Sequence, residues 1–294
     1  MAEAPRFAAI LPTLNRPADL EACLRSIAAA DPRPAEVVVA DQGADRSLEP
    51  LAGAFGARYL HLDRRGLSRA RNAALRTAAS PWLWFPDDDC TAAPDLFKRV
   101  AAALARTPGA AFVAAHVRSP AGRPIMKGMD GRERALATPA DTLATVMSPG
   151  LFVSARALAQ AGAFDESFGV GAEWPSGEES DLLFRLLALG ETGLYVPDAV
   201  VTHPDPYRSL DDAEQVRRAR LYGRGWGALF AKHAAGPQGP AFAAMQRRFE
   251  TRALGGAVLS ALTLRPSRAR RQWQSWLGRR EGWSGWRAAN GERS

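Results

Sequence analysis

The chain has 294 residues, of which 47% are apolar and 23% charged, with a net charge of +7. These values are typical of a soluble globular protein with a sizeable core, built as one large domain or as a domain plus an appendage. No apolar run approaches the roughly 18–20 residues that a membrane span needs, and no signal peptide is recognisable at the N-terminus. The two cysteines, Cys23 and Cys90, form no CxxC pair, which argues against a disulfide framework or a cysteine zinc site and favours a reducing compartment.

Charge divides the chain into an acidic and a basic part. Residues 1–216 hold 22 lysines and arginines against 28 aspartates and glutamates, whereas the residues from Arg217 onward hold 16 against 3. Such an asymmetry indicates two parts with different tasks. We expect a first domain over residues 1–208 and a helical, basic extension over residues 209–294.

Short apolar runs alternate with segments of helical periodicity along the first two hundred residues. The predicted strands are residues 7–12, 36–40, 58–62, 81–85, 111–117 and 194–201. The predicted helices are residues 18–29, 68–79, 95–106, 151–161 and 181–190, with an irregular segment at 118–148 and further helices from Leu210 onward. This alternation predicts an α/β fold with a mostly parallel sheet covered by helices.

Polar residues follow several of the predicted strands, at the ends where ligands bind in such sheets. Thr13, Asp41 and the run Asp87–Asp89 lie at these ends. Three consecutive carboxylates raise one another's pKa unless a cation neutralises them. Mg²⁺ and Mn²⁺ bind carboxylate and phosphate oxygens, so the run is either a metal site or a solvated acidic turn.

Three further segments each have a functional and a purely structural interpretation. Glu178, Glu179 and Asp181 open a predicted helix, where acidic residues either stabilise the helix dipole or supply a general base. The arginines of residues 66–72 either contact phosphates or begin an ordinary basic helix. His203 is either a metal ligand or a loop histidine. Other chemistries lack support, because no glycine-rich phosphate loop, nucleophile elbow or HExxH motif occurs.

The order of these segments resembles glycosyltransferase family 2, the inverting enzymes with the GT-A nucleotide-sugar fold. The resemblance runs from about residue 6 to about residue 205, and each motif is weak alone. The matching segments are Pro12–Arg16 (PTLNR), Asp41–Asp45 (DQGAD), Gly66–Asn72 (GLSRARN), Asp87–Asp89 (DDD), Ala161–Glu166 (AGAFDE), Gly177–Asp181 (GEESD) and His203. The resemblance implies a Rossmann-like αβα sandwich with a mostly parallel mixed sheet, followed by the helical extension.

The resemblance also implies where the donor binds. Thr13, Arg16 and Asp41 would hold the nucleotide, with Asp41 reaching the base or ribose, and Arg71 would lie near the base or diphosphate. The substrate-binding set is completed by Pro12, Gly66, Asp87, Asp88, Trp174 and Glu178. The metal ligands would be Asp87, Asp89 and His203, binding Mn²⁺ or Mg²⁺. Such a metal stabilises the diphosphate as a leaving group.

The catalytic base implied by the resemblance is Glu179. It takes the place of an aspartate in the family and would deprotonate the acceptor hydroxyl, whose oxygen then attacks the anomeric carbon with inversion. The extra methylene of glutamate requires a slightly different position for the carboxylate. Asp181, two residues further on, is expected to brace the site.

Two halves of the first domain would then serve the two substrates. The resemblance places nucleotide-sugar binding in residues 1–117 and the acceptor side in residues 118–208. Residues 147–152 and 173–176 are candidate walls of the acceptor site. Trp174 either stacks on a sugar or is simply packed.

The basic extension mixes arginines with tryptophans and leucines. A basic amphipathic helix with tryptophan can lie on an anionic membrane surface, and many relatives act on lipid-linked acceptors. The alternative is a solvated basic face whose tryptophans pack on the first domain. Nucleic-acid binding is not expected, because no recognised nucleic-acid motif accompanies the basic residues. We expect the protein in the cytoplasm, with peripheral contact to the inner face of the cytoplasmic membrane.

The sequence therefore predicts a hexosyltransferase-type enzyme. It would move a sugar from a UDP-, dTDP- or GDP-linked donor to a hydroxyl of a glycan or lipid-linked acceptor, in surface polysaccharide or glycolipid synthesis. One alternative is a metal-dependent nucleotidyltransferase, against which the lack of a glycine-rich loop with a lysine near residue 12 argues. The other is a non-catalytic nucleotide-sugar-binding protein, against which the intact acidic motifs argue.

Overall fold

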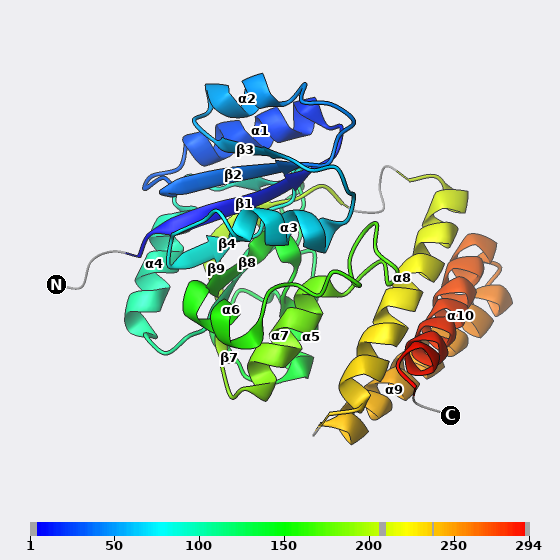
Figure 1. The fold of residues 1–294 in the computed structure, drawn as a ribbon. Helices are drawn as coiled ribbons and strands as arrows, with labels where there is room; N and C mark the ends of the chain where they lie inside the picture. Colours follow the sequence, from blue (N-terminus) through cyan, green and yellow to red (C-terminus); the bar gives the residue numbers. More distant parts are fainter. Residues whose placement is uncertain (1–4, 206–209, 237, 292–294) are drawn as a thin grey trace. The chain divides into compact units, whose positions relative to one another are not determined.

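The computed structural model describes residues 5–205, 210–236 and 238–291. They form two compact units (Figure 1). The sheet unit comprises the described residues up to Phe164 and Leu182–Asp205, and the helical unit comprises Asp165–Asp181 and the described residues from 210 onward. Among the described residues, no helix has both the length and the apolarity that crossing a membrane requires.

The sheet unit is built on one mixed sheet. Its strands are β1 (Phe7–Thr13), β2 (Glu36–Asp41), β3 (Arg58–His61), β4 (Trp82–Trp84), β5 (Thr91–Ala92), β6 (Phe112–Arg118), β7 (Arg134–Leu136), β8 (Leu151–Ser154) and β9 (Gly193–Thr202). They follow the order β3-β2-β1-β4-β8-β6-β9-β5, with β7 paired to β9. Strands β1 to β4 are parallel, as are β6 and β9, whereas β8 is antiparallel to β4 and β6. The predicted mostly parallel mixed sheet is confirmed.

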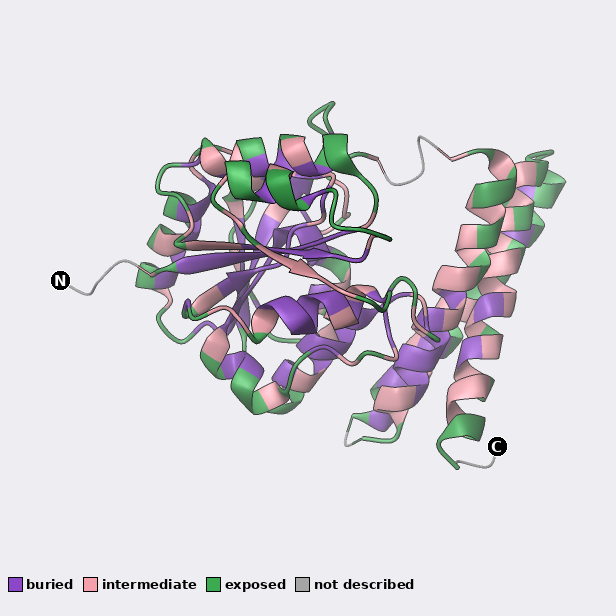
Figure 2. Cartoon of the chain, turned by 45° about the horizontal axis from the view of Figure 1, so that its top comes forward, coloured by how far each residue is buried: buried purple, intermediate pink, exposed green. Residues whose placement is uncertain are grey.

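Helices cover both faces of this sheet, which is why β1 is buried along its whole length (Figure 2). They are α1 (Pro17–Ala28), α2 (Glu49–Ala54), α3 (Leu67–Leu75), α4 (Leu96–Arg106), α5 (Pro139–Thr145), the short 3₁₀ helix η1 (Ser148–Gly150), α6 (Ala155–Ala161) and α7 (Glu178–Ala188), whose first turn belongs to the helical unit. Phe7, Ala9 and Leu11 share a core with α1 and α4. The residues of β1 between these three point to the opposite face of the sheet. Helix α3 also packs on β1 but contributes no residue to the core that α1 and α4 share.

The predicted helix over residues 151–161 is wrong in its first part. Leu151–Ser154 is strand β8, which pairs with β4 and β6, and only Ala155–Ala161 is helical. A short apolar run has no periodicity that separates a buried strand from a buried helix. Ser154 marks the change, because its hydroxyl accepts a hydrogen bond from the backbone N–H of Ala157 at 3.1 Å and caps α6.

Three other expectations need correction. The irregular segment predicted at residues 118–148 contains β7 and α5, and α5 opens with a capping box between Thr138 and Asp141 that is visible in the sequence. Helix α2 was not predicted, and α3 ends at Leu75 instead of Ala79. The N–H of Ala79 binds the carboxylate of Glu36 at 3.0 Å, a tertiary contact that replaces a helical hydrogen bond.

The helical unit contains three long helices, as expected for the basic extension. They are α8 (Asp212–Ala234), α9 (Gly239–Leu262) and α10 (Pro266–Ala289). Glycines line the contact between α8 and α10: a Cβ at Gly223 or Gly227 would collide with the α10 backbone, and one at Gly278 or Gly282 with that of α8. The spacing of four residues places each pair on one helix face, so the two backbones approach closely.

Candidate active site

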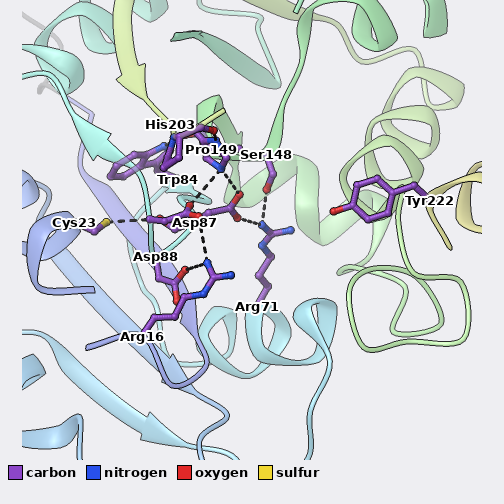
Figure 3. A network of polar contacts seen from close by, with 12 residues as sticks. Arg16, Cys23, Arg71, Trp84, Asp87, Asp88, Ser148, Pro149, His203 and Tyr222 are labelled. Carbon is purple, nitrogen blue, oxygen red and sulfur yellow. Dashed lines mark hydrogen bonds and ion pairs between the residues drawn. The ribbon is translucent and has the colours of Figure 1, made fainter. Parts of the chain in front are cut away.

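An acidic turn follows β4 at the carboxyl edge of the sheet. Asp87 and Asp89 of this turn meet His203, which directly follows β9 (Figure 3). One carboxylate oxygen from each aspartate and one ring nitrogen of His203 all lie within 4.8 Å of one another. The structure thus brings together the three residues expected to bind metal, and we call them the metal group.

The imidazole of His203 faces the two carboxylates through Nε2. This atom lies 3.3 Å from Oδ1 of Asp89 and 3.7 Å from Oδ2 of Asp87. Nδ1 contacts the carbonyl oxygen of Pro204 at 2.5 Å, which fixes the ring as an outer partner fixes a metal-binding histidine. Burial lowers the pKa of His203, but the two carboxylates outweigh it and raise this pKa to about 10. The ring is therefore a cation at neutral pH.

Asp89 has one buried oxygen that faces the ring of His203 in an ion pair at 3.3 Å. Its Oδ1 is buried and makes no regular hydrogen bond to any residue that the structure describes. Burial raises the pKa of Asp89, but His203 and Arg16 outweigh it, and the net shift is downward. An ionised carboxylate whose buried oxygen faces a ring that can give up its proton is a suitable ligand for a metal cation.

Asp88 points toward β1 and links the acidic turn to the motif at its end. It accepts hydrogen bonds from the hydroxyl of Thr13 at 2.8 Å and from Arg16 at 3.2 Å. Arg16 also reaches Oδ2 of Asp89 at 3.2 Å. Burial raises the pKa of Asp88 to about 6, against the opposing effects of Thr13 and Arg16. The structure thus brings Thr13, Arg16 and Asp88 together beside the metal group.

Arg71 is fully buried at α3 and contacts Asp87 rather than an open surface. Its guanidinium donates to Oδ1 of Asp87 at 3.1 Å and to the hydroxyl of Ser148, and it stacks over the ring of Phe164 at 5.4 Å. These contacts make it a positioning residue for Asp87, while contact with a diphosphate stays a prediction. Ser148 lies in the range 147–152, but Phe152 of that range lies in the core.

Asp41 is fully buried at the end of β2, and protein groups bind both of its oxygens. Tyr59 donates to Oδ2 at 2.7 Å and the N–H of Gly43 donates to Oδ1 at 2.8 Å. Burial and the contact with Asp41 raise the pKa of Tyr59 well above its usual range. Tyr59 was not predicted, although a tyrosine in the adjacent strand was a usable signal, because it pairs with Val39, which shares a face of β2 with Asp41.

Gly66 and Pro12, two further predicted substrate-binding residues, occupy positions that shape the backbone. Gly66 precedes α3 with φ of 140°, a conformation that favours glycine. Its N–H donates to the side-chain oxygen of Gln42 at 2.6 Å, which ties the start of α3 to the end of β2. Pro12 is buried within β1. Their contact with substrate stays a prediction.

The remaining predicted residues belong to the helical unit. Glu178 is buried and Glu179 half-buried in the first turn of α7. Asp181 is fully buried and contacts Lys232 at 2.7 Å and His233 at 2.9 Å. Lys232 also binds Asp165 at 2.7 Å.

These contacts tie Asp181 to α8, while its expected role in capping or bracing the site stays a prediction. Lys232 and His233 were not predicted, because they lie on α8, about fifty residues further along the chain. Such a separation leaves no local pattern by which the sequence could have connected them to the acidic motifs. We call Asp165, Asp181, Lys232 and His233 the lysine group.

Trp174 is packed inside the helical unit, with only 4% of its surface exposed. Its ring lies 6.1 Å from that of Trp286, and the guanidinium of Arg224 lies over it at 5.7 Å. Of the two interpretations of this residue, the structure favours packing over sugar stacking.

Comparisons with solved structures place the fold. The mannosyltransferase PcManGT from Pyrobaculum calidifontis, solved in complex with GDP-Man and Mn²⁺, is 20% identical over 95% of this chain and 87% of its own, with a TM-score of 0.64. Residues 1–349 of TarS from S. aureus, in complex with UDP, are 18% identical over 97% and 92%, with a TM-score of 0.58. A further TarS structure is 19% identical over 77% of this chain but only 42% of its own, with a TM-score of 0.56. The predicted GT-A fold class is confirmed.

The sequence itself was compared in two further ways. None of the curated proteins matches it. The family model described as glycosyl transferase family 2 matches residues 8–159, which is more than half of the chain. This match spans the motifs at Thr13, Asp41, Arg71 and Asp87–Asp89, so the chain belongs to glycosyltransferase family 2.

Proposed function

We propose that this family 2 glycosyltransferase is an inverting enzyme that moves a sugar from a nucleoside diphosphate sugar to a hydroxyl acceptor. The observation that carries the proposal is the metal group at the carboxyl edge of a parallel sheet. Ligands of such sheets bind at this edge, and phosphorylated donors need a cation there to balance their charge.

The donor set of the metal group fits Mn²⁺. Asp87 and Asp89 offer carboxylate oxygens that face the ring of His203, and His203 offers an imidazole whose other nitrogen is already engaged. Mg²⁺ strongly prefers oxygen ligands, so the imidazole favours Mn²⁺. PcManGT was solved with this ion. When bound, Mn²⁺ would supply Lewis-acid stabilisation of the diphosphate leaving group.

The nucleotide is assigned to residues beside the metal group in the sheet unit. Asp41 would accept hydrogen bonds from the base or ribose, with Tyr59 holding its carboxylate in place. Arg16, exposed over about half of its side chain, is available to a phosphate while it contacts Asp88 and Asp89. Arg71 would act through Asp87, which it orients.

The transfer step is assigned to Glu179. It lies in the N-terminal turn of α7, among the acidic residues that open the helix. The carboxylate would take the proton of the acceptor hydroxyl, and the oxygen would form a bond to the anomeric carbon. The bond from that carbon to the nucleoside diphosphate breaks on the opposite side, so the configuration inverts and the diphosphate leaves with the bonding pair.

The acceptor is proposed to be a hydroxyl of a glycan or a lipid-linked sugar, in surface polysaccharide or glycolipid synthesis at the cytoplasmic face of the membrane. The basic helical unit supports this assignment, because its charge suits a surface of anionic lipid.

A panel of UDP-, dTDP- and GDP-linked sugars tests the proposal. Thermal shift with Mn²⁺ present should show stabilisation by one nucleotide class, because a ligand of the native state raises its apparent stability. The same class should yield nucleoside diphosphate and a product of inverted anomeric configuration by NMR. Retained configuration would reject the inverting mechanism. Stabilisation by nucleoside triphosphates alone would indicate a nucleotidyltransferase, and binding without turnover across an acceptor panel would indicate a binding protein.

A further inference from the structure

Exposed apolar side chains are concentrated in one part of the helical unit. Of the eight large apolar residues that are exposed among the described residues, six lie between residues 254 and 273. They are Leu254 at 38%, Val258 at 53%, Leu259 at 63%, Leu262 at 77%, Leu264 at 88% and Trp273 at 43%. These residues occupy the end of α9, the turn after it and the start of α10, and we call them the hairpin patch.

Helix α9 changes character along its length. In its first half the exposed side includes Arg247 and Arg248, as in an ordinary surface helix. In its second half Ala253 and Ala257 are buried, while Leu254, Val258 and Leu262 recur every four residues on an exposed side. A helix that is apolar on all sides is normally buried, so the outer side of this segment has no partner among the described residues of the helical unit.

The turn after α9 adds an independent signal. Leu264 has a φ of 54°, the left-handed region that favours glycine. The N–H of Arg265 bonds to the carbonyl of Ser260 at 2.8 Å, and the N–H of Leu264 bonds to that of Ala261 at 3.1 Å. This is the Schellman ending of a helix, whose left-handed position is usually glycine. A leucine in this backbone conformation, with its side chain exposed, destabilises the isolated protein relative to glycine. This cost indicates that the side chain has a function.

The charged residues in the sequence segment that carries the patch are all positive. Residues 251–280 contain seven arginines and no aspartate or glutamate. Arg252, Arg265 and Arg268 are exposed and close in sequence to the patch. Arg270 and Arg271 contact Asp212 of α8, at 3.0 Å and 3.9 Å, and so serve the helical unit itself.

We propose that the hairpin patch inserts into the boundary between headgroups and acyl chains of an anionic phospholipid membrane. The leucines and Trp273 would enter the apolar layer, while Arg252, Arg265 and Arg268 would meet lipid phosphates. Apolar side chains flanked by arginines are the composition of an interfacial anchor. The proposal rests on the proposed function only in that a lipid-linked acceptor would be presented at such a surface.

Co-sedimentation of the full chain with phosphatidylcholine vesicles, with and without phosphatidylglycerol, tests the proposal. The wild type should bind the anionic vesicles, and the double variant Leu262→Ser, Leu264→Gly should bind them about a hundredfold more weakly, since each leucine that leaves the apolar layer costs about tenfold. Leu189→Ser, an exposed leucine of the loop after α7, is the matched control and should bind like the wild type. Arg265→Gln with Arg268→Gln should weaken binding to the anionic vesicles only.

Two measurements keep the outcome decisive. Leu264→Gly alone should melt at the same temperature as the wild type or higher, because glycine suits φ of 54°, so weaker vesicle binding cannot result from misfolding. Mn²⁺-dependent donor binding should be unchanged in all these variants, which separates this proposal from the proposed function. Equal sedimentation of the wild type and the double variant would overturn the membrane assignment. A dimer that only the double variant abolishes would instead assign the patch to a second copy of the chain.

Discussion

Each unit of the molecule contains two aspartates and a histidine in contact, and the two groups differ in the side chain that carries the positive charge between the aspartates. In the lysine group the ammonium of Lys232 lies 2.7 Å from both Asp165 and Asp181, with His233 at 2.9 Å from Asp181. In the metal group the ring of His203 takes this place, with Nε2 at 3.3 Å from Oδ1 of Asp89 and 3.7 Å from Oδ2 of Asp87.

On this difference we base the proposal that the lysine group is structural and the metal group functional. Asp181 is fully buried, and a cation that the chain itself carries balances its charge permanently. Asp87 and Asp89 keep 29% and 22% of their side chains exposed, so a cation from solution can reach them. Carboxylates that share one site need a cation in either case. What distinguishes the two groups is the cation that folding supplies: the imidazolium of His203 can give up its proton to a metal ion and stay as a ligand, whereas the ammonium of Lys232 fills its site itself.

The largest expected effect comes from removing a charge of the metal group. Asp89→Asn should lower the rate of transfer by about 10³-fold or more, because Lewis-acid stabilisation of a leaving group contributes several kcal/mol. Calorimetry should show Mn²⁺ affinity lost in parallel. Asp95→Asn, which breaks the exposed ion pair with Arg99, is the control and should leave both unchanged. Full Mn²⁺ affinity in Asp89→Asn would contradict the assignment.

The second prediction concerns Glu179, the proposed base, which lies two residues before Asp181 of the lysine group. Glu179→Gln should reduce transfer by at least about 10²-fold, the usual contribution of a general base. Its donor affinity with Mn²⁺ should stay within a factor of about two, because an amide keeps the size of the side chain. Single-turnover kinetics and donor titrations measure the two quantities separately. Glu191→Gln, which loses an ion pair with Arg156, serves as control, and near-normal turnover of Glu179→Gln would remove it from this role.

The third prediction concerns removal of the ammonium from the lysine group. Lys232→Met leaves two aspartates without their shared ammonium and should lower the free energy of unfolding by about 3 kcal/mol, as removal of one partner of a buried pair does. Urea unfolding measures this loss. Lys98→Met, at an exposed position of α4, should change the free energy by less than about 0.5 kcal/mol. Adding Asp165→Asn to Lys232→Met should restore part of the loss, and a stable Lys232→Met variant would deny the group its structural role.

The smallest effect is a pH dependence of the metal group. Because the pKa of His203 is raised to about 10, Mn²⁺ must displace a proton from the ring at any lower pH. Apparent Mn²⁺ affinity should therefore rise by about tenfold per pH unit between pH 7 and 9, a range in which Asp88, with its pKa of about 6, is already ionised. Calorimetry in buffers of different ionisation enthalpy should count one proton released. A flat profile in the wild type, or the same slope in His203→Gln, would exclude His203 as a ligand.

Much of the sheet unit follows from local pattern. Alternating apolar runs were enough to predict β1 to β4 and the mostly parallel sheet, because each strand carries its own periodicity and turn signals. The same logic failed at Leu151–Ser154, where the choice between strand and helix depends on the neighbouring strands β4 and β6. Prediction of the site residues had the same strength and the same weakness. The acidic turn was visible because Asp87–Asp89 are consecutive, whereas Tyr59 and Ser148 became visible only as partners of Asp41 and Arg71.

The sequence by itself determined the kinds of group available: an acidic run after a strand, a histidine after another strand, and an acidic helix start. Only the tertiary structure decided which carboxylates share a cation. Asp87 and Asp89 meet His203 because strands β4 and β9 end at one edge, and Asp181 meets Lys232 because α8 packs beside it. Local sequence determines which charged side chains a segment carries. Each charge is balanced by an opposite charge within a few ångströms, and in both groups that partner comes from a distant part of the chain.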